Sequence, residues 1–384
     1  MKKHIRQMIK LALQSLILPL AYRIQSKKPI DPQLILFADT HSDTAPFSMQ
    51  ELIKEAKRRG YRVETFFLDY QSVGIGAVVK SMMSFMKAYA QARCVFISDY
   101  YLPSASCNKR PETDLVQLWH ACGAIKKAGY ITKDDLKGSK VPYSKNYTLV
   151  PVSSEFWVPH FAEIFDVSSD MVLPLGSSRT DCYFEEGYTQ GCQDNLFAHY
   201  PQVRGKKIAL WAPTFRGAAR NPRGFDAETP KLLRDALNQG GDEWELIVKL
   251  HPHVQKKYRG STCDIPVHEL LPVTDLLITD YSSLPFEYAL FDKPCFFYAP
   301  DYEEYQAQRG LLVDIKDDLP FVVETQAESL HASIPQALTS FEPSMQRGII
   351  QKYMSACDGK ATKRIFDHLG LKCGELEDRL AQSE

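Results

Sequence analysis

The hydrophobic and polar positions of this chain follow two alternating periods from residue 33 onward. Short apolar runs, typical of strands buried on both faces of a parallel sheet, are separated by stretches in which apolar residues recur on one helical face. In the first half, strands are predicted at residues 34–38, 61–68, 94–98, 115–119, 147–152 and 171–175, and helices at residues 49–59 and 78–90. Such alternation with short links predicts a doubly wound parallel sheet.

The alternation of strands and helices is then interrupted and begins again further along the chain. Residues 181–204 are mixed and polar, and they are predicted to form a connection. A second series follows at residues 207–212, 231–238, 245–250, 275–279 and 295–299, and residues 324–366 are predicted to be helices that close the second domain. We therefore predict an α/β chain with two Rossmann-like domains facing a cleft, residues 31–190 and 191–384, preceded by a separate segment of residues 1–30.

The stretch from Asp275 to Asp301 contains a predicted junction between a strand and a helix. A short apolar run ends at residues 279–283, five residues whose side chains all carry oxygen, and a helical pattern with Pro285 in its first turn follows. Ser282 and Ser283 therefore lie where free backbone N–H groups at a helix start bind phosphate. The alternative is that the two serines only cap the helix.

The first thirty residues differ from the rest of the chain, because they are basic and contain no acidic residue. Residues 9–22 are apolar but interrupted by polar residues and by Pro19, so they are too short and too polar to span a bilayer. No small-residue cleavage site of a signal peptide is present. A basic amphipathic segment ending in Tyr22 predicts a helix lying in an anionic membrane surface. The alternative is a core helix with a solvated basic face.

Composition sets the outer bounds. The 384 residues suffice for two domains, and 44% hydrophobic with 24% charged residues is an ordinary globular composition. A formal net charge of -1 argues against a chain that coats nucleic acid. Nine cysteines without a C-x-x-C pair suit a reducing cytoplasm better than a disulfide framework or a zinc ribbon.

Polar clusters follow the ends of five predicted strands, which is where ligands bind in open α/β sheets. They are Trp119-His120, Gly176-Ser177-Ser178-Arg179, Pro213-Thr214-Phe215-Arg216, Lys249-Leu250-His251-Pro252 and Asp280-Tyr281-Ser282-Ser283. Because they come from both halves of the chain, we expect them to converge on one cleft.

The members of these clusters indicate the chemistry. Positive charge from Arg179, Arg216 and Lys249, with hydroxyls from Thr214, Ser282 and Ser283, suits a diphosphate. Neither a P-loop nor a dinucleotide fingerprint is present. His120 and His251 can each take a proton from an attacking hydroxyl, or they can be structural hydrogen-bonding groups. His251-Pro252-His253 lacks a third ligand at a sensible spacing, so no metal site is predicted.

Several of these motifs match a known family in order and spacing. Trp119-His120 followed by Lys126-Lys127, then residues 213–216, 249–252 and 279–283, resemble the CDP-glycerol glycerophosphotransferases of teichoic acid synthesis. Pro46-Phe47-Ser48-Met49 and Gln308-Arg309-Gly310 extend the resemblance to residues 30–320, approximately. The length is closer to the primase branch, which adds the first glycerol phosphate to a lipid-linked disaccharide, than to the longer polymerases.

The resemblance implies a GT-B fold with a membrane-associated amino-terminal segment. It implies that His120 is the general base for the acceptor hydroxyl, which attacks the phosphorus bearing glycerol, so that CMP leaves. His251 would contact the diphosphate and stabilise or protonate the departing group. The predicted substrate-binding residues are Trp119, Arg179, Pro213, Thr214, Arg216, Lys249, Leu250, Asp280, Ser282, Ser283 and Glu287.

The chain departs from the family pattern at two places. Ala121-Cys122-Gly123-Ala124-Ile125 follows His120, one residue longer than the Gly-Thr-Pro that the family commonly shows before its lysines. Glu287 stands where many members have Asp. Both departures concern the acceptor and the alditol, because the phosphoryl chemistry itself needs mainly positioning and charge neutralisation.

The predicted function is transfer of glycerol phosphate from CDP-glycerol to a hydroxyl of a lipid-linked acceptor, at the cytoplasmic face of the membrane. CDP-glycerol is a substrate, and neither a cofactor nor a nucleic-acid partner is predicted. One alternative is the same chemistry with CDP-ribitol or with a capsule-polymer acceptor. Another is a GT-B glycosyltransferase using a nucleotide sugar, which needs a base placed for attack at carbon. A non-catalytic surface scaffold would be expected to lack the histidines or the serine pair, and the chain has both.

Overall fold

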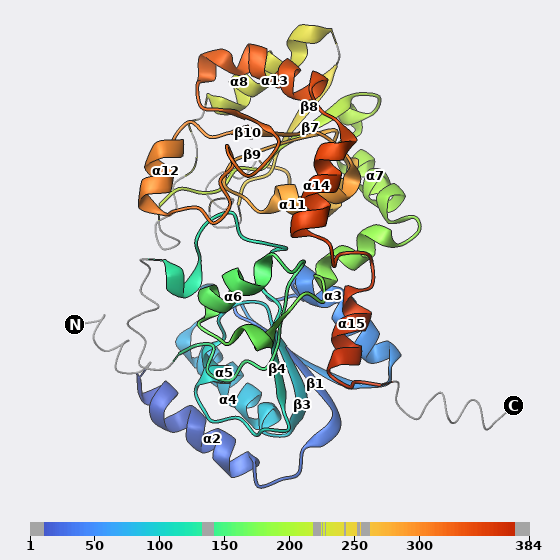
Figure 1. Cartoon of the computed structure of the whole chain (residues 1–384). Helices are drawn as coiled ribbons and strands as arrows, with labels where there is room; N and C mark the ends of the chain where they lie inside the picture. The colour runs from blue at the N-terminus through green and yellow to red at the C-terminus, as the bar shows by residue number, and fades with distance from the viewer. Residues whose placement is uncertain are drawn as a thin grey trace, which may run out of the picture. The chain divides into compact units, whose positions relative to one another are not determined.

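The chain forms two compact units, each built on its own parallel sheet (Figure 1). The computed structural model describes residues 11–132, 142–217, 224, 226, 228–241, 243–251, 254 and 262–372. Unit 1 contains the residues up to His120, Gly129–Cys182 and the residues from Ala356 onward. Unit 2 contains Ala121–Ala128 and Tyr183–Ser355. The α/β class predicted from the sequence is confirmed.

The sheet of unit 1 has the strand order β2-β1-β3-β4, and every neighbouring pair is parallel. Its strands are β1 (Asp31–Asp39), β2 (Arg62–Phe67), β3 (Ala92–Ile97) and β4 (Asp114–Gln117). A parallel bridge from Val116 to Leu149 leads on to the short parallel pair β5 (Val150–Pro151) and β6 (Val172–Leu173). The predicted strands are thus confirmed, and the last two are much shorter than predicted.

Helices cover both faces of this sheet. On one face, α3 (Phe47–Arg58) and α15 (Ala361–His368) contribute Leu52 and Phe366 to a core with Phe37 and Phe96. On the other face lies α4 (Ile75–Tyr89), whose Phe85 contacts Phe66 of β2. The remaining helical segments are η1 (Leu13–Ile17), α2 (Leu18–Gln25), α5 (Leu102–Ala105), η2 (Gly129–Ile131), α6 (Trp157–Phe165), η4 (Ser169–Met171) and η5 (Ser178–Phe184), which runs across the boundary between the units.

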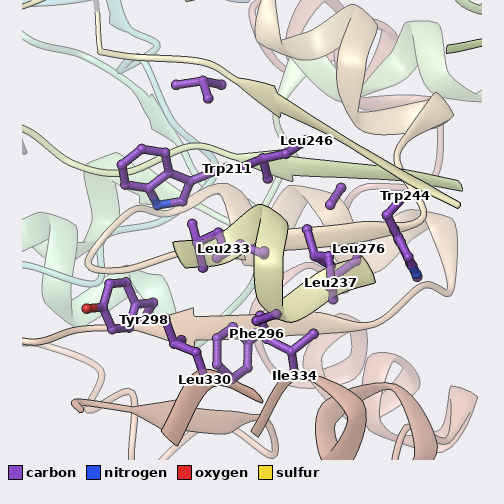
Figure 2. Close-up of a cluster of buried hydrophobic side chains, with 14 of the residues drawn as sticks. Trp211, Leu233, Leu237, Trp244, Leu246, Leu276, Phe296, Tyr298, Leu330 and Ile334 are labelled. Atoms are coloured by element: carbon purple, nitrogen blue, oxygen red, sulfur yellow. The ribbon is translucent and has the colours of Figure 1, made fainter. Parts of the chain in front are cut away.

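The sheet of unit 2 has the order β11-β10-β9-β7-β8 and is also entirely parallel. Its strands are β7 (Lys207–Trp211), β8 (Trp244–Val248), β9 (Leu276–Thr279), β10 (Cys295–Tyr298) and β11 (Val322–Glu324). Because side chains alternate across a strand, Trp211, Leu276 and Phe296 share one face, where Leu233 and Ile334 pack on them (Figure 2). Those last two residues come from α8 (Thr229–Leu237) and α13 (Leu330–Thr339).

The opposite face of this sheet is covered by α11 (Leu284–Tyr288) and α14 (Pro343–Tyr353), which meet through Phe286 and Tyr353 at 4.8 Å (Figure 1). The predicted helix after the serine pair is therefore confirmed, with Pro285 in its first turn. Further helical segments of the unit, apart from α7, are η6 (Pro201–Val203), η7 (Asn238–Gly240), α10 (Val267–Leu270), η8 (Leu271–Val273), η9 (Ala289–Phe291), α12 (Tyr302–Gln308) and η10 (Ala327–Ser329).

Two boundaries differ from the prediction. The predicted connection at residues 181–204 contains α7 (Tyr188–His199), and unit 2 begins before it, at Tyr183 rather than at residue 191. The only buried side chains of α7 are Cys192 and Leu196, one turn apart, so the sequence shows too narrow an apolar stripe to indicate a helix.

The last helix does not close the second domain as predicted, because α15 belongs to unit 1. Asp181 accepts hydrogen bonds from the N–H groups of Ala361 and Thr362 at 3.0 and 2.7 Å, so its carboxylate caps the first turn of α15. Phe366 of the same helix stacks on Phe96 of β3 at 6.0 Å. The predicted closing helices of unit 2 are therefore α13 and α14 alone.

The described part of the amino-terminal segment is helical and packs through one face. Leu18 and Tyr22 are buried, and the ring of Tyr22 lies 5.2 Å from that of Tyr89 in α4. The side chains on the other face, Leu16, Ile17, Leu20 and Ile24, are exposed. Residues 1–10 lie outside the described part. Among the described helices, each is too short or too polar to cross a bilayer.

Candidate functional site

The strand orders indicate where each unit places its polar residues. In unit 1 the neighbours β1 and β3, and in unit 2 the neighbours β7 and β9, lie where the strand order reverses. Ligands of doubly wound sheets bind outside the carboxyl ends of strands at such a point. A ligand of either unit is therefore expected to contact residues that follow these four strands or β4.

In unit 1 a carboxylate lies between two histidines. Asp99 follows β3, and its Oδ2 is 3.8 Å from Nδ1 of His41, which follows β1, and 3.9 Å from Nδ1 of His120, which follows β4. The two imidazoles are half exposed, with 48% and 58% of their side-chain surface accessible. A half-exposed imidazole that faces a carboxylate is placed to take up a proton from a bound hydroxyl.

The backbone around His120 is held in an uncommon conformation. Trp119 has φ +58°, in the left-handed region that a bulky residue rarely adopts. Gln117, which is fully buried, accepts the Trp119 N–H at 2.9 Å and donates to the carbonyl of Asp99 at 3.2 Å. The Trp119 ring lies 4.1 Å from that of His120. The predicted residues Trp119 and His120 thus form one rigid corner with Asp99.

Arg179 joins the same corner, as the strand-end rule predicts. Its guanidinium donates a hydrogen bond to the carbonyl oxygen of His120 and lies 5.2 Å above the ring of Phe47. The neighbouring Ser178 donates to the carbonyl of Ser48 at 2.7 Å. Pro46-Phe47-Ser48, singled out in the sequence without a role, therefore supports the Arg179 loop.

In unit 2 Arg216 is enclosed by carboxylates. It binds Asp280 (Nη1 to Oδ2, 2.8 Å) and Asp301 through two bonds (Nε to Oδ2, 2.5 Å; Nη2 to Oδ1, 2.8 Å). Asp280 also accepts the backbone N–H of Thr214 at 2.8 Å. Tyr281 donates to Asp301 at 3.1 Å. Arg216 and Asp280 were predicted to contact substrate, and the structure gives both an internal role, since they tie together the segments that follow β7, β9 and β10.

The predicted cluster after β8 lies beside this network. Lys249 donates from Nζ to the carbonyl of Cys263 at 2.8 Å, and burial lowers the pKa of its ammonium. Leu250 is buried, and its N–H donates to the hydroxyl of Thr262 at 3.0 Å. The ring of His251 packs against Phe215 at 4.8 Å. Phe215 and His251 therefore bring the segments that follow β7 and β8 into contact within unit 2.

Ser282 and Ser283 differ in their hydrogen bonds to the start of α11. Ser282 accepts the N–H of Leu284 at 3.3 Å, which is the capping role. Ser283 is the residue before α11 and makes no side-chain capping bond. Pro213 and Thr214 lie at the end of β7, and the side chain of Thr214 is buried.

The two departures from the family pattern meet in space. Glu287 in α11 is 2% exposed, and it accepts hydrogen bonds from the hydroxyl of Tyr183 and from the thiol of Cys122 at 3.8 Å. Cys122 belongs to the altered segment after His120, which unit 2 includes. A change in this segment and a longer acid in α11 are therefore parts of one packing arrangement.

No metal centre is found within the described residues, where no group of three His, Cys, Asp or Glu side chains could hold an ion. His253 of the weak His-x-His pair lies outside them. The residues that the sequence interpretation missed are His41, Asp99 and Asp301. Each follows a strand end, which is the signal already used for the five clusters, so the same rule applied after β1, β3 and β10 could have found them.

The sequence matches one protein family along most of its length. Residues 20–370 match the family described as CDP-Glycerol:Poly(glycerophosphate) glycerophosphotransferase. A teichoic acid ribitol-phosphate primase of Bacillus spizizenii is 30% identical over 369 residues, which cover 91% of this chain and 94% of that protein. The teichoic acid glycerol-phosphate primase of Bacillus subtilis is 30% identical over 293 residues, 72% of this chain and 73% of that protein.

A longer relative and two solved structures complete the comparison. A teichoic acid poly(ribitol-phosphate) polymerase of Bacillus spizizenii is 33% identical over 91% of this chain, and the chain spans 58% of that polymerase. A substituted form of the wall teichoic acid polymerase TagF, soaked with CDPG, superposes with a TM-score of 0.74 at 21% identity, covering 100% of this chain and 98% of that one. A UDP-GlcNAc 2-epimerase from Neisseria meningitidis, bound to UDP-GlcNAc, gives a TM-score of 0.52 at 13% identity over 88% and 99% of the two chains. These likenesses establish a GT-B-type fold.

Proposed function

Because the chain belongs to the CDP-glycerol:poly(glycerophosphate) glycerophosphotransferase family, we propose that it transfers an alditol phosphate from a CDP-alditol to a hydroxyl of a teichoic acid acceptor. The observation that carries this proposal is the half-exposed His120 facing Asp99 at the carboxyl ends of β3 and β4. Family membership supports the reaction class, and this pair supplies the base that the reaction needs.

The chemistry follows from the two clusters. His120 takes the proton of the acceptor hydroxyl, and Asp99 stabilises the imidazolium that forms. The hydroxyl oxygen attacks the phosphorus that bears the alditol, the bond from that phosphorus to the bridging oxygen of the diphosphate breaks, and CMP leaves with that oxygen. His251, fixed against Phe215, stabilises the departing charge. Such transfers depend mainly on positioning and on charge stabilisation.

Two donors are candidates. The sequence motifs predict CDP-glycerol, and the glycerol-phosphate primase of Bacillus subtilis supports that donor. CDP-ribitol is the second candidate, because the two relatives that match 91% of this chain are a ribitol-phosphate primase and a poly(ribitol-phosphate) polymerase. The Glu287 group, with Tyr183 and Cys122, is the part of unit 2 in which the chain departs from the family pattern, so we assign alditol choice to it.

We further propose that the protein works at a membrane surface on a lipid-linked acceptor. The support is the exposed apolar stripe of Leu16, Ile17, Leu20 and Ile24, next to the basic residues Arg23, Lys27 and Lys28. An exposed apolar face with adjoining positive charge suits an anionic lipid surface.

The test is CMP release by the purified chain with CDP-glycerol or CDP-ribitol, with and without a lipid-linked disaccharide acceptor. We expect acceptor-dependent release with one of the two donors, and a loss of about 100-fold or more for His120→Ala. His199→Ala changes an exposed histidine of α7 and serves as the matched control.

The other outcomes distinguish the alternatives. Release of nucleotide only from a nucleotide sugar would favour a glycosyltransferase. Binding of a donor without any release would favour the scaffold. Full activity of His120→Ala would contradict the assignment of the base.

A further inference from the structure

A short segment after His120 is anchored to unit 2 by its backbone. The N–H of Leu312 donates to the carbonyl of Ile125 at 2.7 Å, and the N–H of Lys127 donates to the carbonyl of Gly310 at 3.1 Å. Gly310 has φ +77°, and a Cβ there would lie 3.0 Å from Cδ of Lys127, so a larger residue would strain this pairing. Two motifs that are far apart in the sequence, Lys126-Lys127 and Gln308-Arg309-Gly310, are therefore held side by side.

The pairing concentrates positive charge around Lys126. Its ammonium lies 5.7 Å from the ring centre of Phe215 and is close to the guanidinium groups of Arg309 and Arg216. Asp280 is the carboxylate that acts on it, but this group already binds Arg216 at 2.8 Å. Within the described residues, no carboxylate lies at ion-pair distance from the Lys126 ammonium. Burial, with the positive charge of Arg309, lowers the pKa of Lys126 to about 8.

A purely structural role accounts for less of this arrangement than an anion does. A cation over an aromatic ring is a common packing contact, and Lys207 makes one with Trp244 at 5.6 Å elsewhere in unit 2. Packing does not explain why Lys126 is placed beside a second cation, which disfavours its charged form. An anion with more than one negative charge would reverse that effect.

We propose that Lys126 and Arg309 form a phosphate subsite of unit 2 that takes the diphosphate of the nucleotide donor. The proposal rests on the proposed function and deepens it by naming the cations that hold the donor. Phe215 carries Lys126 on its ring and also packs against His251 at 4.8 Å, so a phosphate at Lys126 lies near the histidine assigned to the leaving group. The predicted cations Arg216 and Lys249 both bind protein oxygens, Arg216 through Asp280 at 2.8 Å and Lys249 through the carbonyl of Cys263 at 2.8 Å.

The subsite makes donor binding dependent on pH. Lys126 is surrounded by Arg309 after α12, Arg216 after β7, Asp280 after β9 and Tyr305 of α12, whose ring lies 5.4 Å from the Arg216 guanidinium. Only the protonated ammonium attracts phosphate. Affinity is therefore full below the pKa of Lys126, which is about 8, and falls as the pH rises above it.

The experiment is calorimetric titration of the full chain with inorganic pyrophosphate, CDP and glycerol 3-phosphate, without acceptor and without turnover. We expect Lys126→Met and Arg309→Met to weaken pyrophosphate and CDP binding by about 10-fold each. Lys126→Arg should restore most of the affinity and remove its loss between pH 7 and pH 9.5. Lys207→Met, which deletes a matched lysine over an aromatic ring, should change affinity by less than about twofold.

Wild-type affinity of Lys126→Met, with an unchanged unfolding transition, would overturn the subsite. Dependence of glycerol 3-phosphate binding alone on Lys126 would overturn the donor assignment in favour of an acceptor phosphate. Lys126-dependent pyrophosphate binding without CMP release from any CDP-alditol would support the subsite and contradict the proposed function. CMP release by a chain whose pyrophosphate binding does not depend on Lys126 would support the proposed function and contradict the subsite.

Discussion

At the scale of single residues, Asp99 is the group that faces both histidines of the candidate site in unit 1. Its Oδ1 accepts the N–H of Tyr100 at 2.7 Å, which fixes the carboxylate, and its Oδ2 faces His41 and His120 at 3.8 and 3.9 Å. If His120 is the base, as proposed, Asp99 is expected to position its imidazole.

Asp99→Asn should lower kcat by about 10- to 100-fold, because His120 loses the carboxylate that faces its imidazole. The measurement is the pH dependence of CMP release between pH 5 and pH 9. His41→Gln is the matched control, since it leaves Asp99 facing His120 alone, and we expect a smaller effect. An unchanged profile in Asp99→Asn would show that the carboxylate does not act on the base.

At the scale of elements, one arginine attaches the carboxyl-terminal helix to unit 1. Arg59, which follows α3 and is buried, binds Glu55 at 2.6 Å and Asp367 of α15 at 3.3 Å. It also donates to the carbonyl of Leu371 and lies 5.0 Å from the ring of Phe366. Its neighbour Arg58 binds Glu55 at 2.7 Å from an exposed position.

Arg59→Met should destabilise unit 1 by about 2 kcal/mol, because the buried carbonyl of Leu371 and the partly buried carboxylate of Glu55 lose a donor. Arg58→Met should cost about 0.5 kcal/mol or less, as for exposed ion pairs. Urea unfolding followed by circular dichroism measures both. Equal effects of the two substitutions would mean that burial of Arg59 adds nothing.

The same contacts predict a pH dependence. Hydrogen bonds from Arg58 and then Arg59 lower the pKa of Glu55 from 4.5 to about 2. Because the folded value is the lower one, the stabilisation is present above pH 4.5 and is lost as the pH falls toward 2. Glu55→Gln should therefore flatten the stability profile of unit 1 in this window. A profile as steep as that of the wild type would assign the acid sensitivity to other carboxylates.

At the scale of the whole molecule, the exposed apolar stripe of Leu16, Ile17, Leu20 and Ile24 is the feature that bears on the proposed membrane contact. Leu16 and Leu20 are 69% and 58% exposed, whereas Leu18 on the opposite face is fully buried. One face of this helical segment is therefore packed against unit 1, and its opposite apolar face is exposed. Insertion of such side chains into a lipid interface is favourable in proportion to the apolar area buried.

Leu16→Glu with Leu20→Glu should lower binding to anionic lipid vesicles by about 10-fold or more, because two apolar anchors are lost and two negative charges added. Vesicle cosedimentation measures this. Leu232→Glu is the matched control, since Leu232 is an exposed leucine of α8 in unit 2. Equal loss in the control, or none in the double variant, would contradict the stripe as the membrane contact.

The sequence by itself determined the features that depend on neighbours along the chain. Most strands, the helices at residues 49–59 and 78–90 and the strand-to-helix junction at Ser282 and Ser283 were predicted correctly, because alternation and capping are local properties. The helix α7 was missed, since only Cys192 and Leu196 of it are buried and no apolar stripe marks it. His120 and His251 were predicted for a local reason too, as polar residues at strand ends.

Only the tertiary structure decided which groups are partners. The strand order β2-β1-β3-β4 brings His41 and Asp99 to His120 from three separate strand ends. The fold of unit 2 likewise pairs Arg216 with two carboxylates and places Lys126 close to Arg309. Charge pairing depends on distance in space and on burial, and neither is a property of the linear sequence. Local pattern therefore specifies the elements and the candidate residues, while packing determines what each residue faces.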